Sequence, residues 1–281
     1  MVAGQSNNHN IGFIIQARLG STRLPGKVLL PLPFSHGKPI IQWIADQLQT
    51  SIHNPKTVLA TSVQPTDDEL ANYCKNNNIY CFRGDEDDVL SRYIAVTKKH
   101  GFDTVVRLTG DNPLLDVDIL DRTVQFHLDR SNYYTSSEGM PLGMNIEVIS
   151  GQTLLELENK PLTDPDREHV TRYIRRTDDF KKGVYQIQHV KTLEKLRLTV
   201  DYPSDYAVLS FLLSLYRESD RTGIGLIEYV SEHYPWVFDI NRDNIQRKQF
   251  DSESEEIKAA VKLLKKAEMN KAAERLEEYE T

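Results

Sequence analysis

A short basic loop is the first segment of the sequence whose residue types indicate chemistry. Residues 16–27 (QARLGSTRLPGK) carry three cations, Arg18, Arg23 and Lys27, no acidic residue, and two glycines that let backbone N–H groups approach a ligand closely. Such a combination favours a polyphosphate ligand. A solvated turn with scattered cations is the alternative. The spacing matches neither the Walker A pattern nor G-x-G-x-x-G, so neither a P-loop kinase nor a dinucleotide enzyme is favoured.

Two aspartates share a repeated context. The pattern R-L-T-x-D-x-P occurs at 107–113 and at 197–203, with Asp111 and Asp201 in the same position. Each aspartate follows an apolar run that predicts a strand, and the proline two residues later prevents that strand from continuing. Ligands bind outside the carboxyl ends of strands in open α/β sheets, so both carboxylates are expected over one ligand. Alternatively, either aspartate could cap a helix N-terminus.

Five motifs, in order along the chain, resemble those of a known enzyme family. They are QARLGSTRLPGK at 16–27, RGDEDDVLSRY at 83–93, LTGDNPLL at 108–115, DREHVT at 166–171 and LTVD at 198–201. Together they resemble the cytidylyltransferases that activate acidic sugars, including the 3-deoxy-manno-octulosonate and acylneuraminate enzymes. The branch of spore coat polysaccharide biosynthesis cytidylyltransferases is the most similar. The resemblance covers about residues 11–245 and excludes the C-terminal segment.

The resemblance implies a role for particular residues. Arg18, Lys27, Asp111 and Asp201 would form the catalytic set, and Asp111 and Asp201 would bind Mg²⁺. Nucleotide contacts would come from Ala17, Arg18, Ser21, Arg23, Lys27, Thr61, Ser62, Arg83 and Gly84. Acceptor contacts would come from Asn145, Glu147, Arg167 and His169. Two of the acceptor residues have a structural alternative, since Glu147 could form an internal ion pair and His169 could simply belong to a helix.

These implications agree with the chemistry of nucleotidyl transfer. The expected reaction moves CMP from CTP to an acidic sugar or related surface-polysaccharide precursor and releases pyrophosphate. Magnesium prefers one or two carboxylates together with phosphates and water, and a basic loop stabilises the departing pyrophosphate. A metal that lowers the pKa of the acceptor hydroxyl makes a dedicated protein base unnecessary. The choice of CTP rests on the resemblance, and residues 137–143 (SEGMPLG) contain no decisive acceptor code.

Two other functions remain open at the level of sequence. The acidic run Asp85–Asp88 resembles the D-x-D metal motif of glycosyltransferases that consume a nucleotide sugar, although acidic residues before a helix are more often an N-terminal charge bias. Asp116 and Asp118 call for the same caution. A non-catalytic nucleotide-binding subunit is the third possibility, with the C-terminal helix recruiting a partner.

Hydrophobic periodicity indicates the elements that must position these residues. Apolar runs at 11–15, 57–60, 79–82 and 104–108 predict strands, and they alternate with predicted helices at 39–50, 67–75 and 89–100. This alternation is typical of an α/β fold with a doubly wound, mostly parallel sheet. The resemblance adds that the sheet is nucleotide-diphospho-sugar transferase-like.

The rest of the chain predicts a domain organisation. Residues 1–10 form a polar tail, 11–245 the transferase domain and 246–281 a charged terminal region with one amphipathic helix over 252–280. Short strands at 133–136, 145–149 and 183–190 around one helix at 167–176 indicate a small inserted α+β subdomain at 131–190, for acceptor binding or dimerisation. A core strand at 196–200 and a helix at 204–219 follow. We expect a homodimer.

Composition excludes several classes of protein. The chain has 281 residues and a formal charge of −7, which argues against nucleic acid or anionic membrane as a partner. No apolar stretch approaches the ~20 residues of a membrane helix, and the polar N-terminus has no signal core, so we expect a cytoplasmic protein. Two cysteines cannot form a disulfide framework, and no HxxxH or HExxH pattern supports a zinc hydrolase.

Overall fold

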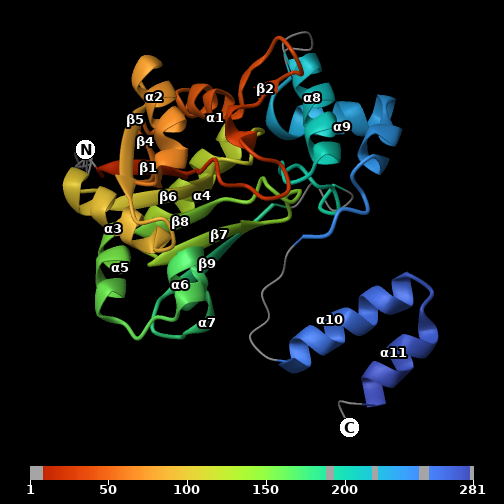
Figure 1. Ribbon diagram of the computed structural model, residues 1–281. Coiled ribbons are helices and arrows are strands. Elements are labelled where there is room, and N and C mark those ends of the chain that lie inside the picture. The colour runs from red at the N-terminus through yellow and green to blue at the C-terminus, as the bar shows by residue number, and fades with distance from the viewer. Residues whose placement is uncertain (1–8, 188–192, 217–220, 247–252, 279–281) are drawn as a thin grey trace, which may run out of the picture. The chain divides into compact units, whose positions relative to one another are not determined.

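The computed structural model describes residues 9–187, 193–216, 221–246 and 253–278 (Figure 1). The chain divides into two compact units, residues 1–243 and residues 244–281. None of the described helices is long and apolar enough to cross a membrane. The predicted active-site residues all belong to the first unit.

A seven-stranded mixed sheet forms the centre of the first unit, in the order β5-β4-β1-β6-β8-β7-β9. Its strands are β1 (Ile11–Gln16), β4 (Lys56–Ser62), β5 (Tyr80–Gly84), β6 (Thr104–Thr109), β7 (Tyr134–Glu138), β8 (Glu147–Ser150) and β9 (Lys182–Gln186). The first four run parallel, β8 is antiparallel to β6 and β7, and β9 is parallel to β7. A two-stranded ribbon, β2 (Pro31–Leu32) with β3 (Lys38–Pro39), lies outside this sheet.

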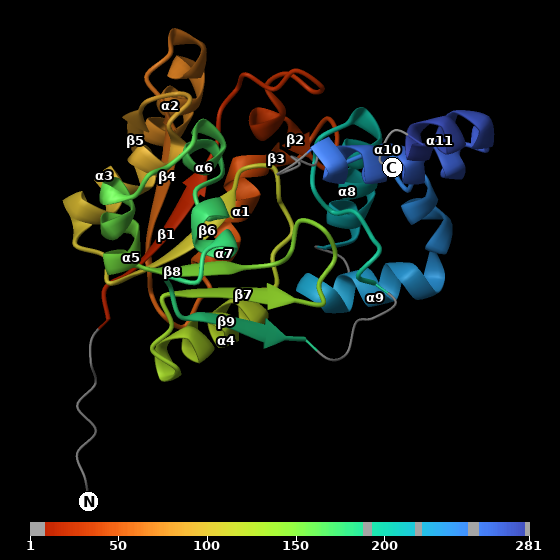
Figure 2. The same ribbon diagram turned by 90° about the horizontal axis from the view of Figure 1, so that it is seen from below.

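Helices cover both faces of the sheet (Figures 1 and 2). Side chains of β1 alternate between two cores: Phe13 and Ile15 pack in one and Ile14 in the other. The first core includes α1 (Ile40–Leu48), α2 (Asp68–Asn76), α4 (Val117–Asp129), α8 (Pro203–Tyr216) and α9 (Gly223–His233). The second includes α3 (Val89–His100), α5 (Gly151–Glu156) and α7 (Arg172–Arg176). The predicted α/β, doubly wound, mostly parallel fold is confirmed.

The strand predicted at 196–200 is wrong. Arg197 forms only an isolated bridge with Leu142, and the N–H of Val200 donates to the carbonyl of Asp111 at 2.8 Å. The segment therefore contacts two separate loops at single points instead of forming a continuous ladder. Its apolar pattern has another cause, because Leu198 and Val200 are fully buried in the core.

Residues 131–190 do not pack as a separate sheet, since β7, β8 and β9 extend the main sheet. The single helix predicted at 167–176 is two short helices, α6 (Asp164–His169) and α7. They are separated by Val170, whose φ of 56° and ψ of −58° are incompatible with a continuous helix. Residues 188–190 of the predicted last strand, and residues 217–219 of the helix predicted at 204–219, lie outside the described residues.

The C-terminal unit contains two helices where one was predicted. They are α10 (Glu253–Lys266) and α11 (Asn270–Glu277). The break follows from Glu268, which adopts a positive φ of 59°, and Lys265 of α10 forms an ion pair with Glu277 of α11. Val261 and Ala273 are the buried residues of the two helices. Residues 252, 279 and 280 of the prediction lie outside the described residues.

Candidate active site

The basic loop after β1 turns back on itself. The N–H of Gly26 donates to the carbonyl of Leu19 at 3.2 Å, and Gly26 has a φ of 65°, which glycine adopts without the steric cost of a side chain. The chain then enters a short 3-10 helix, Lys27–Leu29, in which Lys27 and Val28 are buried. Val28 packs in the hydrophobic core, and the neighbouring Lys27 side chain is buried beside Asp111, which follows β6.

Lys27 joins the two predicted metal ligands. Its Nζ donates to Asp111 Oδ2 at 2.8 Å, to Asp201 Oδ1 at 2.9 Å and to the carbonyl of Val200 at 2.7 Å. Asp111 follows β6, and Asp201 is brought beside it by the backbone bond between Val200 and Asp111. The two carboxylates therefore converge on one cation, as expected from the repeated motif, although only one of them follows a strand.

Further cations surround Asp201. Arg23 lies 3.0 Å from Asp201 Oδ1, and Arg197 donates to Asp201 Oδ2 at 2.7 Å. Burial raises the pKa of the Asp201 carboxyl, but Lys27, Arg23 and Arg197 outweigh that effect and hold its pKa below the ordinary value. Asp201 is consequently ionised at neutral pH, and both of its carboxylate oxygens are bound to cationic side chains.

The donor set suits a magnesium ion that binds together with phosphates. Asp111 and Asp201 supply hard oxygen atoms, which Lys27 Nζ bridges in this structure, and their side chains are 27% and 16% exposed. Within the described ranges, no three His, Cys, Asp or Glu side chains gather into a metal-binding group. Magnesium commonly takes only one or two carboxylates and completes its shell with phosphate oxygens and water. The site therefore fits magnesium as a partner of a nucleotide rather than as an independently bound ion.

Lys27, Arg23, Asp111 and Asp201 form the Lys27 cluster. Arg18 lies apart from it. Its guanidinium is half-exposed and lies 3.5 Å from Glu86 Oε1. The neighbouring Ala17 donates its N–H to the carbonyl of Ala60 at 3.2 Å, which fixes the loop to β4. Gly110 approaches Ala17 so closely that a Cβ on it would lie 2.7 Å from the Ala17 Cβ. These contacts fix the backbone beside Arg18, and the half-exposed Arg18 side chain is accessible to an anion.

The ends of β4 and β5 provide the remaining predicted nucleotide contacts. Thr61 and Ser62 are fully buried, so their contact with a nucleotide remains a prediction. Arg83 donates to the carbonyls of Ser62 and Gln64, both at 2.9 Å. Gly84 accepts a backbone bond from Val63 at 2.8 Å. Ser21 donates its N–H to Leu19 and is half-buried in the basic loop.

Asp67 was missed by sequence reasoning. It is 1% exposed, and its carboxylate accepts from the N–H of Leu19 at 2.7 Å and from the hydroxyl of Ser62. The carboxylate thus links the basic loop to the end of β4. Its sequence signal was only that of an acidic residue at a helix start.

Glu147 is the centre of a largely buried network beside β6. It accepts from Arg107 at 2.5 Å, from the Tyr134 hydroxyl at 2.5 Å and from the Thr171 hydroxyl at 2.8 Å. Burial raises the pKa of Glu147, but Arg107 and the Tyr134 hydrogen bond more than compensate and lower it overall. Burial, followed by the charge of Glu147, raises the pKa of Tyr134. The ion pair considered as the structural alternative for Glu147 is therefore present.

The other predicted acceptor residues lie on separate segments. Asn145 is exposed and donates to the carbonyl of Met140 at 3.3 Å. Arg167 is bound to Asp88, the N-cap residue of α3, at 2.6 Å. His169 is half-buried, and its carbonyl accepts from the N–H of Thr171 at 2.5 Å.

That bond closes a γ-turn around Val170. The positive φ of Val170 is rare and strained for a β-branched residue. The side chain of Val170 is fully buried, which holds the turn in place. The turn follows the half-buried His169 and places the Thr171 hydroxyl on Glu147, so the DREHVT motif connects the surface to the buried network.

Residues of both acidic runs accept hydrogen bonds from backbone N–H groups. Asp85 Oδ1 accepts from the N–H groups of Asp87 and Asp88, at 2.9 and 2.8 Å, and these bonds are the main cause of its lowered pKa. Asp116 caps α4 through the N–H of Ile119 and also accepts from Ile224 at 2.9 Å. The reading of both runs as helix N-terminal groups is the one that these bonds support.

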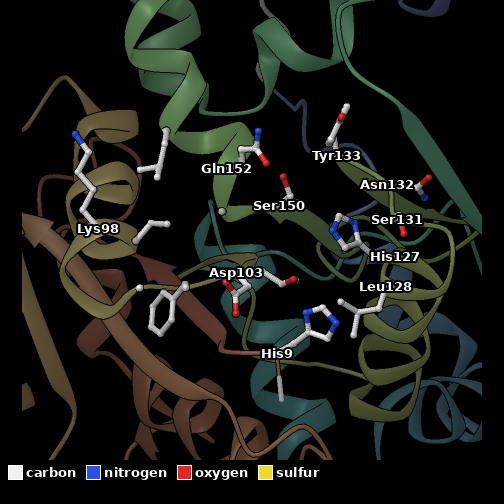
Figure 3. A pocket seen from close by; sticks show the side chains of 16 residues that line it. His9, Lys98, Asp103, His127, Leu128, Ser131, Asn132, Tyr133, Ser150 and Gln152 are labelled. Atoms are coloured by element: carbon white, nitrogen blue, oxygen red, sulfur yellow. The ribbon is translucent and has the colours of Figure 1, made fainter. Parts of the chain in front are cut away.

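A cavity of about 950 Å³ lies at the opposite end of the central strands (Figure 3). Asp103, at the start of β6, and Ser150, at the end of β8, contribute to its wall together with His127 of α4. None of the predicted site residues lines it. Its position at the amino ends of β1 and β6 separates it from the Lys27 cluster, where ligands of such sheets bind.

Known proteins share this sequence and fold. The sequence profile of the family described as Cytidylyltransferase matches residues 12–223. The chain is 36% identical over 233 residues to the spore coat polysaccharide biosynthesis protein SpsF of Bacillus subtilis strain 168, covering 79% of this chain and 93% of that protein.

Two solved structures agree with this relationship. A cytidylyltransferase from Leptospira borgpetersenii serovar Hardjo-bovis superimposes with a TM-score of 0.75 at 30% identity, covering 86% of this chain and all of that one. A CMP:2-keto-3-deoxy-manno-octonic acid synthetase in complex with CTP gives a TM-score of 0.57 at 15% identity, covering 73% and 98%, which shows a shared fold. From the profile match, the SpsF similarity and the fold, the chain belongs to the cytidylyltransferase family of nucleotidyltransferases.

Proposed function

We propose that the protein transfers CMP from CTP to an acidic sugar or a related surface-polysaccharide precursor, in a magnesium-dependent reaction that releases pyrophosphate. The observation that carries the proposal is the convergence of Asp111 and Asp201 on the Nζ of Lys27, at 2.8 and 2.9 Å. The similarity to SpsF supports a surface-polysaccharide precursor as the product. The CTP complex of the octonic acid synthetase, which shares the fold, supports the nucleotide.

Each residue of the site has a task in this reaction. The acceptor hydroxyl attacks the α-phosphorus of CTP in line, and the bond to pyrophosphate breaks. Lys27 and Arg23 stabilise the negative charge that develops on the phosphates, and Arg18 at the loop mouth binds the triphosphate. Asp111 and Asp201 would hold magnesium, which supplies positive charge to the phosphates and lowers the pKa of the acceptor hydroxyl. His169 and Arg167 approach the acceptor, while Asn145 borders it.

Glu147 has an indirect place in the proposal. Its carboxylate is committed to Arg107, Tyr134 and Thr171, so it supports the strained turn that carries His169. The guanidinium of Arg167 suits an acceptor that carries a carboxylate or phosphate. The homodimer and the acceptor role of residues 131–190 remain predictions.

The test is pyrophosphate release by the pure protein with each of the four nucleoside triphosphates, magnesium and a panel of nonulosonates, octulosonates and phosphorylated sugars. We expect release from CTP with one class of acceptor, and loss of that release in Asp111→Ala and Lys27→Ala. Asp85→Ala is the matched control, because the bonds of Asp85 are local. Release of a nucleoside phosphate from a nucleotide sugar, lost in Asp85→Ala and retained in Asp111→Ala, would favour the glycosyltransferase. Binding of CTP without turnover across the panel would favour the non-catalytic subunit.

A further inference from the structure

We propose that Asp205, acting with Arg197 and Asn241, is a positioning residue that orients the Asp201 carboxylate toward the magnesium ion. The inference rests on the proposed function, because it takes Asp201 as a metal ligand. The three residues lie outside the roles implied by the family resemblance. Arg197 lies in the segment before Asp201, Asp205 in the first turn of α8, and Asn241 near the end of the first unit.

Asp205 is fully buried and receives at least four hydrogen bonds. Its Oδ2 accepts from the N–H groups of Asp201 and Tyr202, both at 3.0 Å. Its Oδ1 accepts from Arg197 Nε and from Asn241 Nδ2, both at 2.9 Å. A carboxylate has about four acceptor positions, so these donors occupy its capacity. Asp205 therefore supports its neighbours and is not itself a metal ligand.

Arg197 transmits this support to Asp201. Its Nε donates to Asp205 Oδ1 at 2.9 Å, and its Nη2 donates to Asp201 Oδ2 at 2.7 Å. The second oxygen of Asp201, Oδ1, is left facing Lys27 and Arg23. Arg197 is 6% exposed, so its orientation is set by packing as well as by these bonds. These contacts hold the Asp201 side chain in one rotamer. Its Oδ2 is bound to the buried Arg197, and its Oδ1 faces Lys27 and Arg23.

The absence of a strand before Asp201 makes this support necessary. Asp111 follows β6, where ladder hydrogen bonds on both sides hold the backbone. The segment that leads to Asp201 makes an isolated bridge at Arg197 and a single backbone bond from Val200 to the carbonyl of Asp111, without a continuous ladder. Asn241 strengthens the same point, because its Nδ2 also donates to the carbonyl of Arg197 at 2.9 Å. Hydrogen bonds from side chains thus fix the position of Asp201, whereas backbone hydrogen bonds of the sheet fix the position of Asp111.

The charge balance of the cluster points the same way. Lys27, Arg23 and Arg197 face Asp111, Asp201 and Asp205, so three cations meet three carboxylates. Asp205 neutralises Arg197, which would otherwise offset the charge of Asp201. If Asp205 lost its charge, the cluster would carry an excess of one cation and would bind a divalent metal less well. A purely structural role for Asp205, as a stabiliser of the first turn of α8, makes no such demand on metal affinity.

Mn²⁺ binding in the presence of CTP and without acceptor separates these two roles, with electron paramagnetic resonance measuring free Mn²⁺. Asp205→Asn and Asn241→Ala are the variants. Asp121→Asn is the matched control, because Asp121 is also buried and accepts from Ser51 Oγ at 2.5 Å and from the N–H of Ile52 at 3.0 Å, away from the cluster. The Tm of each protein is measured alongside.

We expect the Kd for Mn²⁺ to rise about tenfold or more in Asp205→Asn and about threefold or more in Asn241→Ala, as is typical when an outer support of a metal ligand is lost. Asp121→Asn should lower the Tm but leave the Kd within about twofold of the unmodified protein. Unchanged Mn²⁺ affinity in both cluster variants, with a Tm that falls as in the control, would overturn the inference. If Asp205→Asn fails to fold, Asn241→Ala decides. If the unmodified protein with CTP binds no Mn²⁺, the proposed metal role fails and this inference fails with it.

Discussion

Replacing Lys27 by methionine removes the cation on which the proposed site is built while keeping most of its apolar stem. The side chain of Lys27 is 10% exposed and its Nζ makes three hydrogen bonds of 2.7–2.9 Å. Leaving a buried charge without its partner costs about 3–5 kcal/mol. We expect the low end, about 3 kcal/mol, because Asp111 is 27% exposed and Asp201 keeps Arg23 and Arg197. The Tm should fall by about 6–12 °C.

The pH dependence of the unfolding free energy identifies why Lys27→Met loses stability. The folded-state pKa of Asp201 is depressed, with Lys27 foremost among the groups that lower it. A depressed carboxyl pKa stabilises the fold above the unfolded value, about 3.9, and this contribution disappears as the pH falls through the folded value. Lys27→Met removes the largest of the contributions that lower this pKa, while Arg23 and Arg197 remain. The difference in unfolding free energy between the two proteins should therefore shrink as the pH falls from 7 to about 3.

Urea unfolding at several pH values measures this difference, and pyrophosphate release from CTP measures activity, which should fall about a hundredfold or more. Lys38→Met is the matched control. Lys38 pairs with the carboxylate of Asp46, whose side chain is 38% exposed, so its loss should cost less than about 1 kcal/mol. A stability difference for Lys27→Met that stayed constant down to pH 3 would refute the electrostatic reasoning, because lost packing would then explain it.

Three further predictions concern the surroundings of the site. Glu147→Gln should lower the unfolding free energy by about 3 kcal/mol in urea titrations, because the largely buried Arg107 would lose its counter-charge. Gly143→Ala should lower it by about 1–3 kcal/mol, since Gly143 has a φ of 100° and a Cβ there would lie 2.9 Å from the Leu198 carbonyl group. Asp116→Ala should cost about 1–2 kcal/mol and speed hydrogen exchange at the start of α4, which it caps.

Each of these predictions has a control within the chain. Glu158→Gln removes a more exposed ion pair with Lys98, Gly225→Ala adds a Cβ with no neighbour within 4 Å, and Asp118→Ala removes an acidic residue of the same helix turn as Asp116. The control variants should lose little stability. A control that lost as much as its partner would contradict the contact assigned to that partner.

The positions of the parallel strands along the chain were predictable because their signals are local. Short apolar runs bounded by turns predict buried strands, and β1, β4, β5 and β6 are found where those runs occur. The strand expected at 196–200 failed for the same reason that it was expected: buried Leu198 and Val200 produce an apolar pattern without a partner strand. The helix expected over 167–176 failed at Val170, whose positive φ depends on burial that no local pattern reveals.

The sequence by itself determined which groups are available for chemistry: a basic loop after the first strand, and two aspartates in one repeated context. It also contained Arg107 and Arg197 at the same motif position, and each now pairs with a carboxylate. Only the tertiary structure decided that Lys27 meets Asp201, 174 residues away, and that Asn241 closes the network behind it. Hydrogen bonds between distant segments leave no periodic trace in a sequence, because their partners are chosen by the packing of the whole fold.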